Sequence, residues 1–291
     1  MRAFRTGVFI LSLISFAFAN AQTSPAWQEK RQSPSDLEVS GALAGLPPGS
    51  TRYLTRDKLL ALPQGKFTVT NDTNFSGPAK IRGVELEELA RHLAASPASA
   101  MVVAVCDDAY ASYYPRSYLA AHHPMLVLQV NGQPPSGWPK AAADHASDMG
   151  PYMISNPKFL PSFKVLSHTD EAQIPWGVIR IEFRAEKELL RAIAPRGPHA
   201  QDRDVQDGFR IAQQNCLRCH NAGIEGGQKS GLPWDFLGAK AAASPKDFGA
   251  YIRDPKAKNP QAQMYANPEY DDATLAALTA YFRTFSKPTK P

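Results

Sequence analysis

Hydrophobic and polar positions follow different patterns in the two parts of the chain. Up to about residue 196, short apolar runs bounded by proline, glycine and polar residues predict strands. These runs cover residues 66–70, 100–105, 125–130, 152–154, 163–167 and 177–183. Two short amphipathic stretches, 55–62 and 85–94, predict helices between them. This part is therefore expected to fold as an α+β domain.

Beyond residue 200 the apolar residues recur at helical spacing. Helices are predicted over 204–214, 248–255 and 271–285. In the last of these, Leu275, Leu278 and Phe282 share one face, and acidic residues at its start favour the positive end of the helix dipole. The proline- and glycine-rich stretch 194–200 reads as the linker between a sheet domain and an all-α domain.

Composition agrees with two folded domains and excludes some partners. The chain has 291 residues, of which 43% are hydrophobic and 20% are charged. Its formal net charge of +5 falls to +3 if Arg2 and Arg5 are removed with a leader segment, as argued below. A balance so close to neutral does not indicate nucleic acid as a partner.

The first 21 residues have the features of a secretory signal peptide. Arg2 and Arg5 form a basic start, residues 8–19 are almost wholly apolar, and Ala19-Asn20-Ala21 fits a cleavage site. Nothing later is long and apolar enough to span a bilayer, so the mature chain is expected to lack a transmembrane segment. We expect export to the periplasm, with an uncleaved anchor as the alternative.

Two of the three cysteines belong to a recognisable motif. Cys216, Cys219 and His220 form C-x-x-C-H, in which two thiols bond covalently to the vinyl groups of a haem c and the histidine ligates iron. A redox-active dithiol or half of a zinc site is the alternative. A helix rather than a strand precedes the motif, and no cysteine follows it, so both alternatives are disfavoured.

Met264 is the candidate for the second axial ligand of the iron. It follows Pro260 in a polar loop before the last predicted helix, and its thioether is a soft ligand suited to low-spin haem iron. A core methionine is the alternative, and Met149 and Met153 are the substitutes if Met264 fails. The aromatic residues expected to line the haem are Trp234, Phe236 and Tyr265.

With these motifs in place, residues 201–287 resemble a class I monohaem cytochrome c domain. The resemblance rests on the helix leading into Cys216-Leu217-Arg218-Cys219-His220, Asp254-Pro255, Pro260 before Met264, and the terminal helix from Asp271. It implies one covalent haem c on Cys216 and Cys219, with His220 as proximal and Met264 as distal ligand. Such domains pass single electrons, so a periplasmic or membrane-associated redox protein is the expected partner.

Residues 50–185 resemble the oxidoreductase molybdopterin-binding domain of the sulfite oxidase type. The matching runs are 53–59, 81–86, 104–110, 128–134, 150–154 and 176–182. In the catalytic branch one cysteine donates a thiolate to molybdenum, and by position Cys106 is the candidate here. Asp107 and Asp108, which follow the cysteine, differ from the residues usual in that branch. Their carboxylates would repel the phosphate of a pterin cofactor. Alternatively, Cys106 is a buried structural thiol, and the two carboxylates belong to a turn or a cap.

The expected organisation has five parts. They are a signal peptide (1–21), an N-terminal extension (22–49), a mixed-sheet α+β domain (50–193), a linker (194–200) and a cytochrome c domain (201–287). His122, His123, His145 and His168 are expected at the surface or at caps. We expect a periplasmic monohaem electron-transfer protein with an N-terminal docking or ligand-binding module. The alternative is a molybdopterin-dependent oxidoreductase passing electrons from Cys106-bound molybdenum to its haem.

Overall fold

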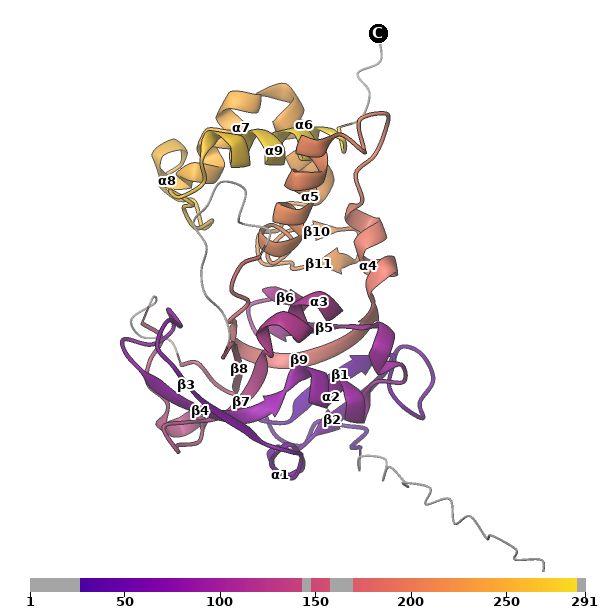
Figure 1. Cartoon of the computed structure of the whole chain (residues 1–291), viewed down its shortest axis with the longest axis vertical. Helices are drawn as coiled ribbons and strands as arrows, with labels where there is room; N and C mark the ends of the chain where they lie inside the picture. Colours follow the sequence, from indigo (N-terminus) through magenta and orange to yellow (C-terminus); the bar gives the residue numbers. More distant parts are fainter. Residues whose placement is uncertain (1–26, 143–147, 158–169, 287–291) are drawn as a thin grey trace, which may run out of the picture.

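A sheet with flanking helices occupies the first part of the chain, and a group of helices lies against one side of it (Figure 1). The computed structural model describes residues 27–142, 148–157 and 170–286. The predicted signal peptide, the strand predicted at 163–167, His145 and His168 lie outside these residues. The predicted fold class, a mixed-sheet α+β domain followed by a helical domain, is confirmed.

The sheet domain is built around its longest strand, β9. The strands are β1 (Leu37–Gly41), β2 (Ser50–Leu54), β3 (Gly65–Val69), β4 (Ala79–Glu85), β5 (Ala100–Cys106), β6 (Ala111–Tyr114), β7 (Met125–Val130), β8 (Tyr152–Ser155) and β9 (Trp176–Ala185). They run in the order β2-β1-β9-β8-β7-β4-β3, and β5 pairs with β9 and β6. The β1–β9 pair is parallel and the others are antiparallel, so the sheet is mixed.

One strand of this sheet, β1, lies within the stretch 22–49, which the sequence predicted as an extension. β1 pairs with β2 on one edge and with β9 on the other, with Val39 opposite Ile181. Only Leu37 and Val39 alternate with polar residues there, which is too short a pattern to reveal a strand. The second half of the predicted extension is therefore part of the sheet.

Three helices, α1 to α3, pack on the sheet, and a fourth, α4, directly follows β9. They are α1 (Arg56–Leu60), α2 (Leu86–Leu93), α3 (Arg116–His122) and α4 (Glu186–Ile193), with single 3-10 turns at Pro97–Ser99 and Pro135–Gly137. The Thr55 hydroxyl accepts a hydrogen bond from the backbone N–H of Lys58 and so caps α1. The apolar side of α2 packs onto the sheet through Leu86, Leu89 and Leu93.

Strand β5 is buried on both faces, which explains its nearly unbroken apolar sequence. Val102, Ala104 and Cys106 face the core beneath α2 and α3. Met101 and Val103 face the opposite way and share a second core with the helical domain. Side chains alternate across a strand, so one strand serves two cores. The two domains are thereby joined through packed apolar surface as well as through the chain.

The helical domain contains five helices in the described part of the chain. They are α5 (Arg203–Asn215), α6 (Trp234–Ala243), α7 (Pro245–Arg253), α8 (Pro255–Lys258) and α9 (Asp272–Arg283), with a small hairpin of β10 (Asn221–Ala222) and β11 (Glu225–Gly226) after α5. The three predicted helices correspond to α5, α7 and α9. Helices α5 and α9 cross at Gly208, where an added Cβ would lie 2.1 Å from the carbonyl oxygen of Ala277.

Tyr281 ties this helical core to the end of the sheet domain. Its buried hydroxyl accepts a hydrogen bond from the indole N–H of Trp234 (3.0 Å) and donates one to the carbonyl of Ile193 in α4. Ile193 directly precedes the predicted linker. None of the helices in the described ranges is both long and apolar enough to cross a bilayer.

Candidate cofactor site

The C-x-x-C-H motif forms the turn that ends α5. The N–H of Cys216 still donates to the carbonyl of Ala212 (2.9 Å), and the N–H groups of Cys219 and His220 donate to the carbonyl of Cys216 (3.2 and 3.0 Å). Residues three and four apart on a helical turn point to the same side. The turn therefore presents two unpaired thiols and one imidazole together.

The imidazole of His220 is held in one orientation. Its Nδ1 lies 2.9 Å from the carbonyl oxygen of Leu232 and 2.8 Å from Oγ of Ser230. A carbonyl oxygen only accepts, so this bond requires the proton on Nδ1 and leaves the Nε2 lone pair available to a metal. Burial lowers the pKa of His220 below its ordinary value, with the bond to Leu232 acting in the opposite direction. The ring is therefore neutral near pH 7, as a ligand must be.

Met264 lies half-buried on the loop between α8 and α9, as the sequence predicted. The loop is anchored by Asn267, whose N–H and side-chain amide donate to the carbonyls of Arg253 and Ile252, both at 3.0 Å. Met264 packs against the same helical core as Cys216 and lines a cavity of about 590 Å³ that Lys229 and Tyr265 also line. Two thiols are thus available for covalent attachment, and one imidazole nitrogen and one thioether are available as iron ligands. This set of groups fits a covalently attached haem c.

The sheet domain also contacts the motif. Arg218, between the two cysteines, accepts a hydrogen bond from the N–H of Ala111 on β6 (2.9 Å) through its carbonyl. Its guanidinium donates to the carbonyls of Gln214 (2.5 Å) and Ala172 (3.3 Å). Gln173, buried between the domains, donates to the side-chain oxygen of Gln214 (2.9 Å). Apart from the bond between Arg218 and Gln214, these contacts join residues far apart in sequence, and no local pattern could have revealed them.

Cys106 lies at the end of β5 and is buried, with 4% of its surface exposed. Burial is the largest cause that raises the pKa of its thiol well above the ordinary range, and Asp108 and Asp107 add to the rise. Asp108 also accepts a hydrogen bond from the N–H of Tyr110 (3.0 Å), which is the turn role that the sequence favoured for it. The thiol is therefore protonated near pH 7.

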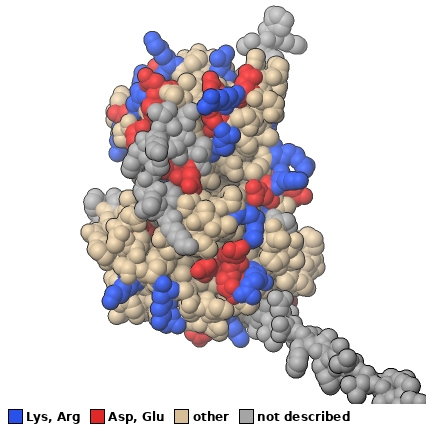
Figure 2. Space-filling view, in the orientation of Figure 1, with Lys and Arg blue, Asp and Glu red and all other residues tan. Residues whose placement is uncertain are grey.

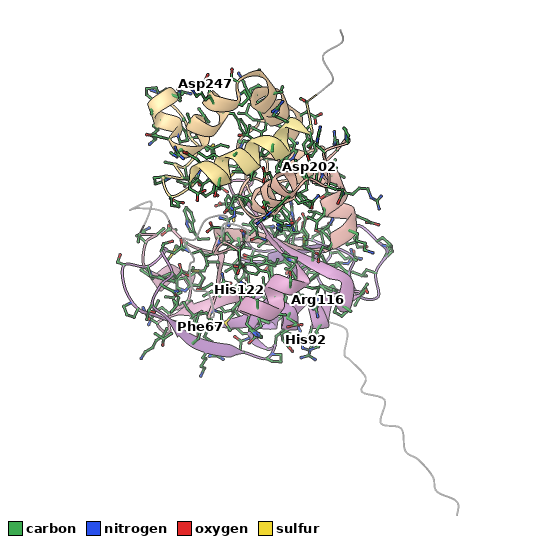
Figure 3. All side chains as sticks on the ribbon, turned by 45° about the horizontal axis from the view of Figure 1, so that its top comes forward. Phe67, His92, Arg116, His122, Asp202 and Asp247 are labelled. Atoms are coloured by element: carbon green, nitrogen blue, oxygen red, sulfur yellow. The ribbon has the colours of Figure 1, made fainter. Side chains whose placement is uncertain are left out.

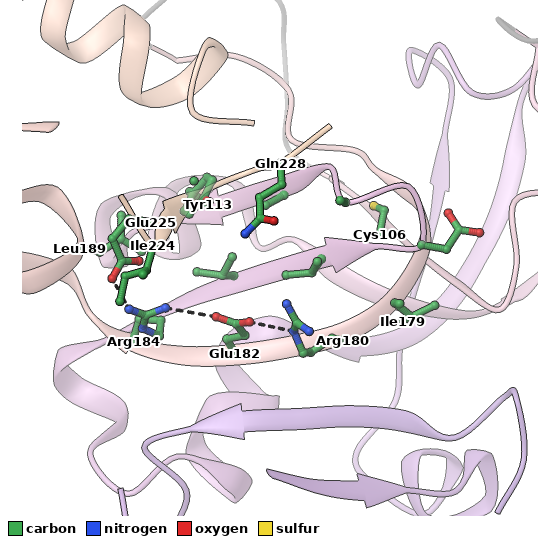
Figure 4. Close-up of a pocket in the computed structure, with 16 residues that line it drawn as sticks. Cys106, Tyr113, Ile179, Arg180, Glu182, Arg184, Leu189, Ile224, Glu225 and Gln228 are labelled. Carbon is green, nitrogen blue, oxygen red and sulfur yellow. Dashed lines mark hydrogen bonds and ion pairs between the residues drawn. The ribbon is translucent and has the colours of Figure 1, made fainter. Parts of the chain in front are cut away.

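A cavity of about 480 Å³ opens beside Cys106, between β9 and the β10–β11 hairpin. Figure 4 shows Arg180, Glu182 and Arg184 in a row along β9 at its edge. Glu182 pairs with Arg180 (2.7 Å) and with Arg184 (3.3 Å), and Arg184 also pairs with Glu225. Both cations are neutralised by carboxylates, and Asp107 adds another negative charge, so the lining does not fit a pterin phosphate.

Further predicted residues fall in different places. His122 (Figure 3), expected at the surface or at a cap, is the last residue of α3 and is buried. Its Nε2 lies 2.8 Å from the carboxylate of Asp170, and its ring is tilted by 51° against that of Tyr118. The end of the helix agrees with the expectation, whereas the burial does not agree with a surface position. Trp234 is in the helical core, whereas Phe236 and Tyr265 are exposed. Met149 and Met153, the substitute ligands, are buried in a separate core of the sheet domain.

Within the ranges 27–142, 148–157 and 170–286, no group of three or more His, Cys, Asp or Glu side chains is placed to hold a metal ion by itself. The cysteines and the histidine of the C-x-x-C-H motif are thus no such group; in a haem site the thiols bond to the vinyl groups and only the histidine ligates the iron. On the face in view in Figure 2, basic and acidic side chains are interspersed, in agreement with the modest net charge.

Comparison with known proteins supports the assignment of the second domain. The family model for cytochrome c matches residues 205–286, from α5 to just beyond α9. No curated protein matches the chain by sequence. Among solved structures, the sulfane dehydrogenase SoxCD from Paracoccus pantotrophus is similar, with 14% identity and a TM-score of 0.37 over 60% of this chain and 45% of that one. This chain thus spans less than half of that protein. Residues 205–286 form a cytochrome c domain, which follows a mixed α/β sheet domain in the same chain.

Proposed function

We propose that this chain is a c-type monohaem electron-transfer protein whose N-terminal domain serves as a docking or ligand-binding module. One observation carries the proposal. Two cysteines and a histidine share one helical turn, and the Leu232 carbonyl fixes the histidine with Nε2 free. This arrangement within a cytochrome c domain is what covalent attachment and axial ligation of one haem c require.

Each residue of the site has a separate task in this proposal. Cys216 and Cys219 supply the two thioether bonds, His220 supplies the proximal nitrogen, and Met264 supplies the distal sulfur. A haem c bound in this way provides a one-electron couple, with the histidine and methionine ligands favouring a raised potential. The carbonyl of Leu232 keeps the His220 ring in place, so little reorganisation is needed on electron transfer.

The proposal does not include molybdenum at Cys106. The thiol is buried at the end of β5, and the carboxylates of Asp107 and Asp108 follow it directly, where a pterin phosphate would have to approach. The arginines of the neighbouring cavity are already paired with glutamates. Cys106 is better explained as a small buried residue at the end of β5.

We also propose that the protein works in the periplasm with a redox protein as its partner. The basic and apolar N-terminal segment supports export, and haem c is attached outside the cytoplasm.

The test is a coulometric titration of the purified full-length protein, with iron and molybdenum measured in the same sample and Cys106→Ser alongside. The proposal predicts one electron per chain, iron without molybdenum, and an unchanged electron count in Cys106→Ser. Near-equal molybdenum and iron, with extra electrons and molybdenum lost in the variant, would make the chain a molybdenum oxidoreductase instead.

A further inference from the structure

The turn between β5 and β6 lies directly on the haem-attachment segment. This turn, residues 107–110, is held by two interdomain backbone hydrogen bonds, one from within it and one from the residue after it. The N–H of Ala111 donates to the carbonyl of Arg218 (2.9 Å), and the N–H of Gln228 donates to the carbonyl of Ala109 (3.0 Å). Arg218 is inside the C-x-x-C-H motif, and Gln228 lies just after the β10–β11 hairpin that follows the motif. Two backbone hydrogen bonds therefore fix the position of this turn of the sheet domain against the haem-attachment segment.

Side chains reinforce this contact. The ammonium of Lys229 forms an ion pair with the carboxylate of Asp108, at the tip of the turn. The same ammonium lies 5.9 Å from the ring centre of Tyr110 and 6.0 Å from that of Tyr265, next to Met264. A cation within about 6 Å of an aromatic face is attracted to it. Lys229 thus links the turn of the sheet domain to the loop that holds the distal ligand.

The pair places two opposite charges beside the haem-attachment segment. Lys229 lines the same cavity as Met264, and the N–H of the next residue, Ser230, donates to the carbonyl of Cys219 (3.1 Å). The carboxylate of Asp108 lies against the ammonium of Lys229, so its charge is close to the same segment. The side chains of Lys229 and Asp108 are 33% and 43% exposed, so water screens them only in part.

We infer that the β5–β6 turn is one wall of the haem site, and that Asp108 and Lys229 shift the reduction potential of the haem in opposite directions. The inference rests on the proposed function and gives the sheet domain an electrostatic part in it. Reduction adds one electron, so a nearby carboxylate disfavours it and a nearby ammonium favours it. The sheet domain would then supply the negative charge and the cytochrome c domain the positive one.

The test uses full-length protein carrying its haem, in two single variants. Asp108→Asn removes the negative charge and keeps an oxygen acceptor for the N–H of Tyr110. Lys229→Met removes the positive charge and keeps the stem beside the tyrosine rings. We expect the midpoint potential to rise in the first and fall in the second. At the wild-type midpoint, the ratio of reduced to oxidised haem should change at least about twofold in each direction.

Two controls separate charge from structure. In the variant combining Asp108→Asn and Lys229→Met, the two shifts should largely cancel. Asp247 and Lys258 form the same kind of pair, at 2.9 Å, within the cytochrome c domain and more exposed to water. Figure 3 places Asp247 at the end of the molecule away from the sheet. Asp247→Asn and Lys258→Met should therefore shift the potential less than the variants at the turn.

Each outcome is decisive. If the pair acts only by keeping the domains together, both single variants open the site to water and shift the potential in the same direction, which would overturn the inference. Shifts no larger than those of the control pair would also overturn it. A wild-type protein without covalent haem would refute the proposed function itself. Should a variant not take up haem, Asp108→Ser and Lys229→Gln carry the same predicted signs.

Discussion

The crossing of α5 and α9 offers a quantitative test, because α5 leads straight into the haem-attachment turn. At Gly208 an added Cβ would lie 2.1 Å from the carbonyl oxygen of Ala277 and 2.7 Å from Cβ of Tyr281. Both atoms belong to the packed side of α9 and cannot rotate away. In Gly208→Ala the helices must therefore separate, which costs about 1–3 kcal/mol or more, against a gain of about 1 kcal/mol in helix propensity.

Gly249→Ala is the matched control within α7. The nearest atom to its added Cβ is Cβ of Leu275, at 3.6 Å, which is an ordinary contact. That variant should keep the gain in helix propensity, up to about 1 kcal/mol. The assay is denaturant unfolding followed by far-UV circular dichroism and haem absorbance. We expect Gly208→Ala to unfold at lower denaturant than wild type, and Gly249→Ala at the same or higher. Equal midpoints for the two variants would refute the close packing at Gly208.

Three further predictions concern the ligand, the thiols and the core. Met264→Ala should keep covalent haem but lose the methionine-ligated low-spin spectrum, whereas Met153→Leu should not, and a spectrum retained in Met264→Ala would show that another residue is the ligand. Since burial raises the pKa of Cys106, native protein should resist alkylation from pH 7 to 9, and unfolded protein should expose one thiol; three thiols would mean no thioether bonds. Tyr281→Phe leaves the Trp234 N–H and the Ile193 carbonyl without their partner, so the unfolding free energy should fall by about 1–3 kcal/mol, and an unchanged value would contradict these hydrogen bonds.

The sequence predicted the elements whose signals are local. The C-x-x-C-H motif, the amphipathic face of α9 and the apolar run of β5 each lie within a few residues, and each appears where expected. β1 was missed because its place depends on pairing with β9, far along the chain. The burial of His122 was not predicted, because its contact with Asp170 joins residues far apart in the chain.

The contacts around the candidate site were also beyond the reach of local patterns. Ser230 gave no signal as a partner of His220, which lies ten residues earlier in the chain. Asp108 was interpreted as a turn residue, which is correct, but its ion pair with Lys229 joins two domains. Such pairs depend on how the sheet and the helices pack together, and only the folded chain reveals them.

Covalent attachment of one haem at the turn after α5 is the central claim, and intact-mass analysis of the exported protein under denaturing conditions tests it most directly. Wild-type protein should carry the mass of one haem after unfolding and acid extraction. A variant with both Cys216→Ser and Cys219→Ser should lose it on extraction. Wild-type protein with the mass of the bare chain, or a double variant that keeps its haem, would contradict the account.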